Sequence, residues 1–137
     1  QISMGANQNQ ALKAFKEAEA YPGPSIVIAY SPCIAHGIKE GMGKSQTEEK
    51  LATEAGYWPI FRFDPRLIEQ GKNPLQIDCK DPDWDKFEDY LKRERRYTIL
   101  AGEFPERAKE LFAQNKRNAQ DRWTYYKRLS SLDYTQN

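Results

Sequence analysis

The chain has 137 residues, which is the size of one ordinary globular domain. Its 21 Lys and Arg residues face 20 Asp and Glu residues, so a net charge of +1 excludes a global field that attracts nucleic acid, anionic membrane or acidic substrate. No apolar run approaches the roughly 18 residues of a membrane span, and no signal-peptide pattern opens the chain. We therefore expect a soluble, cytoplasmic protein that binds neither membrane nor nucleic acid. The chain opens at Gln1 without an initiator methionine, which suggests a piece of a longer polypeptide.

The N-terminal part predicts a helix followed by a strand. Leu12, Phe15 and Ala18 recur at helical spacing and predict a helix over residues 7–21. The next segment, residues 25–31, is a continuous apolar run. Because a run that is apolar on both faces is typical of a strand covered on both sides, we expect a buried strand of a parallel sheet here.

A second helix and two more strands follow. Ser45 and Glu48 have the spacing of a capping box and predict a helix over residues 45–55. Alternating or aromatic apolar residues predict strands over residues 57–63 and 75–79. Helix, strand, helix and strand in this order predict an α/β fold.

The C-terminal part is helical. A short polar helix is predicted over residues 84–96, and a longer one begins at Pro105 and runs to about residue 129. We therefore divide the chain into an α/β portion, residues 1–80, and a helical extension, residues 81–137, that packs on it.

Two patterns offer alternative functions. The string GMGKS at residues 41–45 resembles the end of a phosphate-binding loop, with Lys44 as the phosphate contact, but Gly37 lies one residue too far upstream for the motif. The long helix carries seven basic against three acidic residues between positions 105 and 132, with three aromatic residues interleaved. That combination is also found in RNA-binding surfaces, so a free-standing module that binds RNA or a protein partner is the main alternative.

The cysteines are the candidate metal ligands. Two of them, Cys33 and Cys79, are too few for a disulfide scaffold or a self-contained zinc site. Cys33 follows the predicted strand directly, where ligands bind in open α/β sheets, so its thiolate is placed to ligate iron or to act as a nucleophile; the alternative is a small buried side chain. His36, the sole histidine, lies three residues further on and either shares a metal with Cys33 or makes one hydrogen bond. Cys79 reads as a core residue.

Long strings of this sequence resemble the pyruvate:ferredoxin (flavodoxin) oxidoreductases. The matching strings are QISMGAN at 1–7, KEAEAYPGPSIVIAYSPCIAHG at 16–37, EAGYW at 54–58, GKNPLQ at 71–76 and the closing residues 122–129. The resemblance spans nearly the whole chain and places it at the end of the thiamin-diphosphate domain of that family. It implies the end of a thiamin-diphosphate-binding parallel sheet with flanking helices, followed by the helical extension.

The resemblance also implies a role for Cys33 as the fourth ligand of the [4Fe–4S] cluster nearest the thiamin, with the other three ligands upstream in the parent chain. The parent enzyme would be a homodimer that converts pyruvate and coenzyme A to acetyl-coenzyme A and CO₂ and passes electrons through clusters to ferredoxin or flavodoxin. Thiamin diphosphate and magnesium would be bound mainly by residues outside this chain. We assign no catalytic residue here, and we expect the 137 residues alone to be inactive.

Overall fold

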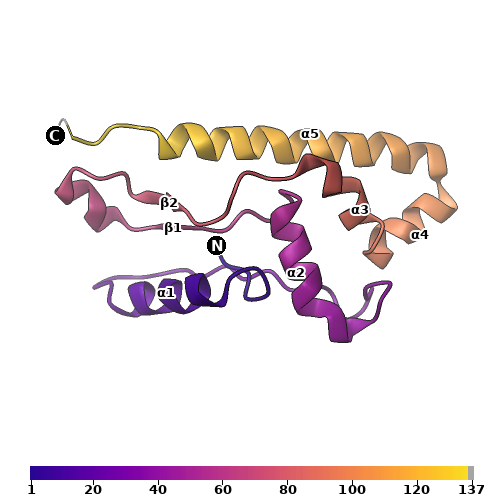
Figure 1. Ribbon diagram of the computed structural model, residues 1–137, viewed down its shortest axis with the longest axis horizontal. Helices are drawn as coiled ribbons and strands as arrows, with labels where there is room; N and C mark the ends of the chain where they lie inside the picture. Colours follow the sequence, from indigo (N-terminus) through magenta and orange to yellow (C-terminus); the bar gives the residue numbers. More distant parts are fainter. Residues whose placement is uncertain (136–137) are drawn as a thin grey trace.

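The computed structural model describes residues 1–135. Figure 1 shows three layers: a long helix along one side, extended segments and two short strands in the middle, and the first helix on the other side. The elements are α1 (Gln8–Glu19), η1 (Met42–Lys44), α2 (Ser45–Glu54), β1 (Phe61–Phe63), η2 (Pro65–Gln70), β2 (Leu75–Ile77), η3 (Trp84–Lys86), α3 (Phe87–Leu91), α4 (Arg95–Glu103) and α5 (Pro105–Ser130).

Helix α1 lies where it is predicted but faces the other way. Asn7 caps it by accepting a hydrogen bond from the Gln10 amide. Ala14 is on the buried side, and its small side chain lets the helix approach the extended chain beneath it. Leu12 and Phe15 are exposed, Leu12 at 61%. The periodicity therefore predicts the helix correctly, and its apolar stripe is not covered by the residues described.

Residues 25–31 are extended but do not form the predicted buried strand. They make a single parallel bridge, in which the Ile2 amide donates to Ile28 O at 2.9 Å and the Tyr30 amide donates to Ile2 O at 3.1 Å. Ile26 is 85% exposed and Ile28 is 53% exposed. The prediction of burial is wrong for the described chain, because within residues 1–135 no strand covers these side chains.

The sheet of the described residues is a two-stranded antiparallel pair. Phe61 lies opposite Ile77, and Phe63 lies opposite Leu75. Both strands fall inside their predicted ranges, so their existence is confirmed and their length is shorter. The observed fold is a mixture of helices with a small sheet, and the expected parallel sheet is not seen in residues 1–135.

The main core joins α2, α3 and α5. Its buried residues are Ala52, Ala55, Phe87, Tyr90, Leu91 and Ala119. Gly56 ends α2 with a positive φ of 79°, and a Cβ atom there would lie 2.7 Å from the ring of Trp84. The turn after α2 is thus fitted closely to the helical extension.

The predicted helix over 84–96 is broken. It consists of η3 and α3, after which the backbone becomes extended at Glu94 and forms an antiparallel bridge with Ile38. Helix α4 then begins at Arg95, and the sequence analysis missed it. The helix is interrupted at Glu94, whose side chain is fully buried.

Helix α2 is confirmed, but its capping box is wrong. The Ser45 hydroxyl donates to Met42 O instead of accepting from the first turn of the helix. The Glu48 carboxylate accepts from Arg93 Nε at 2.8 Å. Glu48 is therefore the buried partner of Arg93 in an ion pair and does not form a helix cap with Ser45.

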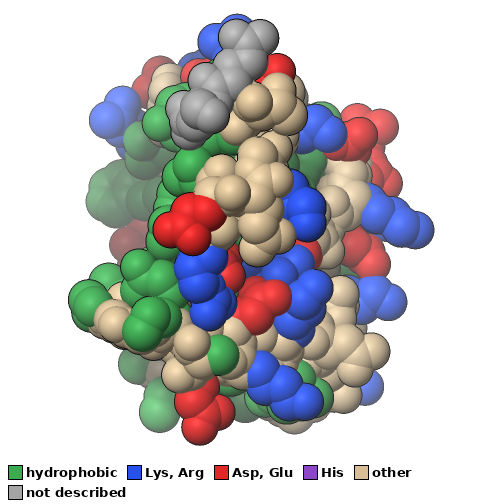
Figure 2. All heavy atoms as spheres, turned by 90° about the vertical axis from the view of Figure 1, so that its left-hand side faces the viewer, with side chains coloured by type: hydrophobic (Ala, Val, Ile, Leu, Met, Phe, Trp, Pro, Cys, Tyr) green, Lys and Arg blue, Asp and Glu red, His purple; other side chains and the backbone are tan. Residues whose placement is uncertain are grey.

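Helix α5 is confirmed over nearly its whole predicted length. It begins with Pro105 in its first turn and buries Ala108, Ala119 and Trp123. None of the helices within residues 1–135 combines the length and the apolar character that crossing a membrane requires. Figure 2 views the left-hand end of Figure 1, where hydrophobic side chains gather along one edge and charges of both signs are mixed across the centre.

Candidate functional site

Cys33 begins a tight turn at the surface. The Gly37 amide donates to Cys33 O at 2.8 Å, and Gly37 has a φ of 74°, which glycine adopts without strain. The turn places the partly exposed Cys33 thiol beside the amides that follow it. The contact between Cys33 and His36 that their spacing predicts is present in the structure.

The surroundings of Cys33 favour the thiolate. The His36 backbone N–H, then the His36 ring, whose Nδ1 is 3.3 Å from Sγ, and then the Ala35 backbone N–H lower the pKa of Cys33 to about 7. Near neutral pH, therefore, a large fraction of this thiol is ionised and able to bind a soft metal ion. N–H donors directed at a ligand sulfur also orient it and tune a bound iron centre.

A buried polar cluster lies beside the turn. Tyr30 and Tyr90 share a short hydroxyl contact, and Tyr30 Oη donates to Glu94 Oε1 at 3.0 Å. Burial raises the pKa of both phenols, so they remain neutral donors. The sequence analysis missed this cluster, since its members lie on three segments up to 64 positions apart.

The second cysteine lies in a different environment. Cys79 is half-buried, its Sγ donates to Ile60 O at 3.6 Å, and burial raises its pKa. Among residues 1–135 no three His, Cys, Asp or Glu side chains are grouped to hold a metal ion. Residues 1–135 therefore form no complete metal site by themselves, and Cys33 is the thiol among them whose pKa is lowered.

The GMGKS loop is not arranged as a phosphate cradle. The Gly41 amide donates to Ile38 O at 3.0 Å and the Lys44 amide donates to Gly41 O at 3.0 Å. These two N–H groups are used within the loop, whereas a phosphate-binding loop directs its amides at the ligand. The geometry gives Lys44 no role in nucleotide binding.

Several basic and aromatic side chains of α5 pack against the rest of the chain. Trp123 is buried, the ring centroids of Tyr126 and Phe61 lie 5.1 Å apart in a tilted contact, and Tyr125 is 58% exposed. Arg122 donates to Tyr57 O at 3.1 Å. Since single-stranded nucleic acid needs exposed aromatic faces, this packing does not support the RNA-binding alternative.

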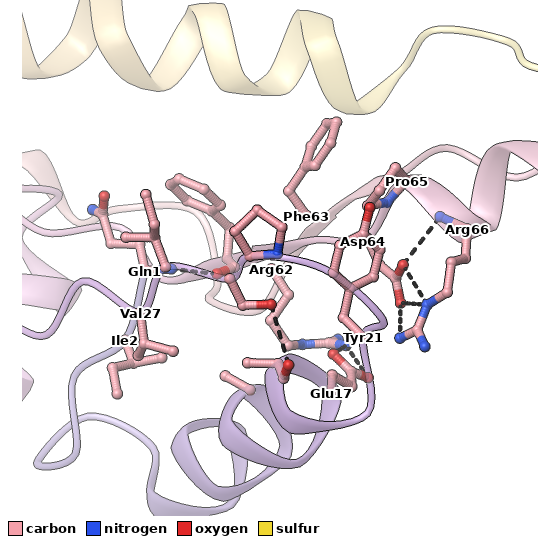
Figure 3. A pocket seen from close by; sticks show the side chains of 16 residues that line it. Gln1, Ile2, Glu17, Tyr21, Val27, Arg62, Phe63, Asp64, Pro65 and Arg66 are labelled. Carbon is pink, nitrogen blue, oxygen red and sulfur yellow. Dashed lines mark hydrogen bonds and ion pairs between the residues drawn. The ribbon is translucent and has the colours of Figure 1, made fainter.

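A groove of about 270 Å³ lies between α1 and β1 (Figure 3). Arg62 dominates it, donating to both carboxylate oxygens of Glu17 at 2.8 Å and to both of Asp78 at 2.8 Å. Figure 3 shows Arg62 directed at Glu17 and Arg66 directed at Asp64. Both guanidinium groups are satisfied internally, so the groove presents no unpaired charge from either to a ligand.

Comparison with known proteins identifies relatives along almost the entire chain. A pyruvate-flavodoxin oxidoreductase of Enterobacter agglomerans is 50% identical over 131 residues, 96% of this chain and 11% of the relative. A pyruvate:ferredoxin oxidoreductase of Moorella thermoacetica is 50% identical over 129 residues, 94% of this chain and 11% of the relative. The predicted resemblance is confirmed. The mitochondrial pyruvate dehydrogenase [NADP(+)] of Euglena gracilis is 43% identical over 123 residues, 90% of this chain and 7% of the relative.

The chain therefore spans about a tenth of the length of the curated relatives that it matches. No family model matches it. A match over 96% of the chain extends across the Cys33 turn in the comparison with the Enterobacter protein.

Proposed function

We propose that this chain is a segment of an enzyme that oxidises pyruvate with coenzyme A to acetyl-coenzyme A and CO₂ and passes the electrons to a carrier protein. The names of the relatives support the pyruvate part: they share pyruvate and differ in the acceptor, which is flavodoxin, ferredoxin or NADP⁺. A segment common to all three belongs to the shared half of the reaction. The parent protein would use thiamin diphosphate and magnesium, held mainly by residues outside this chain.

The observation that carries the role of this chain is the Cys33 turn. Its thiol is partly exposed, and the neighbouring His36 and Ala35 amides hold its pKa at about 7. These properties suit a metal ligand, and the other thiol of residues 1–135, Cys79, has a raised pKa. Cys33 would supply one of the four thiolates of a [4Fe–4S] cluster, with the other three from the rest of the parent polypeptide.

A bound cluster supplies one-electron acceptance. The residues of this chain lower the pKa of the ligand thiol, and the His36 ring lies 3.3 Å from its sulfur. Gly37 closes the turn that presents those groups. No residue here is assigned to the bond-breaking chemistry of pyruvate.

The extended segment over 25–31 supports a second structural proposal. Its bridge to Ile2 is parallel, which gives the direction of pairing. Ile26 and Ile28 are exposed apolar side chains of the kind that a second layer covers in a parallel sheet. We propose that this segment is a strand of a parallel sheet completed by the rest of the parent polypeptide. The homodimeric parent and its cytoplasmic location remain predictions.

The function is tested by activity in the full-length polypeptide that carries this segment. Pyruvate- and coenzyme A-dependent reduction of ferredoxin or flavodoxin is measured for Cys33→Ala and for Cys79→Ala, the matched control. We expect Cys33→Ala to lose most of the turnover and Cys79→Ala to keep it. Wild-type turnover in Cys33→Ala would refute the role of this residue, and a wild-type polypeptide that does not oxidise pyruvate would refute the function.

A further inference from the structure

Both ends of the Cys33 turn are tied to one short stretch, residues 93–95, which joins α3 to α4. This stretch belongs to the helical extension, about 60 positions away in sequence. The contacts on the two sides of the turn differ in kind: side chains hold the entering chain, and backbone groups hold the leaving chain.

The entering chain is held by Tyr30, three residues before Cys33. Its hydroxyl contacts Tyr90 Oη and donates to Glu94 Oε1 at 3.0 Å. Tyr90 Oη also lies 3.4 Å from the same Glu94 oxygen, but its single proton is used in the shorter contact with Tyr30. Tyr90 thus donates to Tyr30 and Tyr30 donates to the Glu94 carboxylate, a charge-assisted bond that is stronger than a neutral one.

The leaving chain is held by backbone pairing. The Arg95 amide donates to Gly37 O at 3.2 Å, and the Lys39 amide donates to Arg93 O at 2.8 Å. These two bonds surround the antiparallel bridge between Ile38 and Glu94. Glu94 therefore contributes its side chain to one end of the turn, and its neighbours Arg93 and Arg95 contribute backbone hydrogen bonds to the other.

Packing alone does not account for an acidic side chain at position 94. It is completely buried, and its second oxygen, Oε2, lies 3.2 Å from Nε of Arg96. Arg96 in turn lies over the rings of Tyr57 and Tyr97, at 5.9 and 5.0 Å from their centroids. A carboxylate is costly to bury unless it is paired, and here Oε1 accepts from Tyr30 beside the turn while Oε2 faces Arg96.

We infer that Glu94 and Tyr30 form a clamp that positions the Cys33 sulfur for its metal centre. The inference rests on the proposed function for the identity of that centre, and on geometry for the clamp itself. Glu94 and Tyr30 are positioning residues: they act through the turn and touch neither the substrate nor the metal.

The clamp is tested by hydrogen exchange in the full-length polypeptide, with peptides covering residues 33–39. Tyr30→Phe removes one hydroxyl and keeps the ring. We expect exchange in these peptides about tenfold faster, the effect of one lost hydrogen bond on local opening. Tyr57→Phe is the matched control: its hydroxyl bonds Tyr97 at 2.9 Å within the same aromatic cluster. Equal exchange in Tyr30→Phe and Tyr57→Phe would overturn the clamp.

A conservative pair at Glu94 separates its hydrogen-bonding role from its bulk. Glu94→Gln keeps an oxygen that accepts from the Tyr30 hydroxyl, whereas Glu94→Ala removes it. We expect Glu94→Gln to retain most of the protection over residues 33–39 and Glu94→Ala to lose it. Equal loss of protection in the two variants would overturn the role of the Glu94 acceptor.

Positioning of the sulfur has its own spectroscopic readout. The g-values of the reduced cluster are recorded by low-temperature EPR, and we expect a shift in Tyr30→Phe and none in Tyr57→Phe. Unshifted g-values in Tyr30→Phe would overturn the positioning role. If Cys33→Ala keeps every cluster signal, the proposed function fails, and hydrogen exchange alone then decides whether the clamp exists.

Discussion

Arg93 joins an exposed carboxylate to a fully buried one. Its Nη1 and Nη2 donate to Glu40 at 2.7 and 2.9 Å, and its Nε donates to Glu48 at 2.8 Å. Arg93→Ala would leave the Glu48 charge buried without its cation. Removing one partner of a buried pair costs about 3–5 kcal/mol. We expect about 3 kcal/mol, the lower end, because the Arg93 side chain is 24% exposed and water can enter in its place.

The loss should depend on pH. Burial raises the pKa of Glu48, so the folded state binds its proton more tightly than the unfolded state does. Stability from this group is therefore present below the unfolded pKa of 4.5 and falls as pH rises through the folded pKa. Without Arg93 the folded pKa rises further, so the destabilisation of Arg93→Ala should be larger at neutral pH than near pH 4.5.

Urea unfolding of the 137-residue chain, followed by far-UV circular dichroism, measures this loss. The double variant Arg93→Ala/Glu48→Gln is the control, because it removes the buried charge together with its partner and should recover much of the stability. An Arg93→Ala midpoint equal to wild type at neutral pH would refute the reasoning. So would a loss of the same size in the single and the double variant.

Three further predictions concern other parts of the chain. Gly56→Ala should lower the free energy of unfolding by about 1–2 kcal/mol because of the positive φ, and further because of the contact with Trp84; an unchanged urea midpoint would contradict the turn geometry. Cys33 should be alkylated at half its maximal rate at a pH of about 7, well below Cys79, whose pKa burial raises; a half-maximal pH of 9 would contradict this. Asn73→Ala loses two hydrogen bonds to carbonyls at the end of α5, so amide exchange there should be faster than in wild type, and equal rates would exclude that anchor.

The sequence predicts the helices well where periodicity, caps and breakers agree. Helices α1, α2 and α5 lie within a few residues of their predicted bounds. The burial predicted for residues 25–31 is not seen for a physical reason: an apolar run indicates that a segment needs a covering layer, but residues 1–135 do not supply that layer, and Ile26 is exposed. A pattern in one segment cannot show what lies against it.

The site is predicted in part for the same reason. Cys33 and His36 are close in sequence, so their meeting can be predicted from local spacing. Tyr30, Tyr90 and Glu94 are brought together only by packing of α3 against α2 and the extended chain. The one local signal was an acidic residue within a predicted helix, and such a residue is usually a solvated one. The pairing of distant residues therefore required the structure.

The central claim is that Cys33 ligates a [4Fe–4S] cluster of a larger oxidoreductase. Low-temperature EPR of the dithionite-reduced full-length polypeptide tests it most directly, with Cys79→Ala as the reference. We predict that Cys33→Ala loses or alters the signal of one cluster while Cys79→Ala keeps the wild-type spectrum. A Cys33→Ala spectrum identical to wild type would contradict the account.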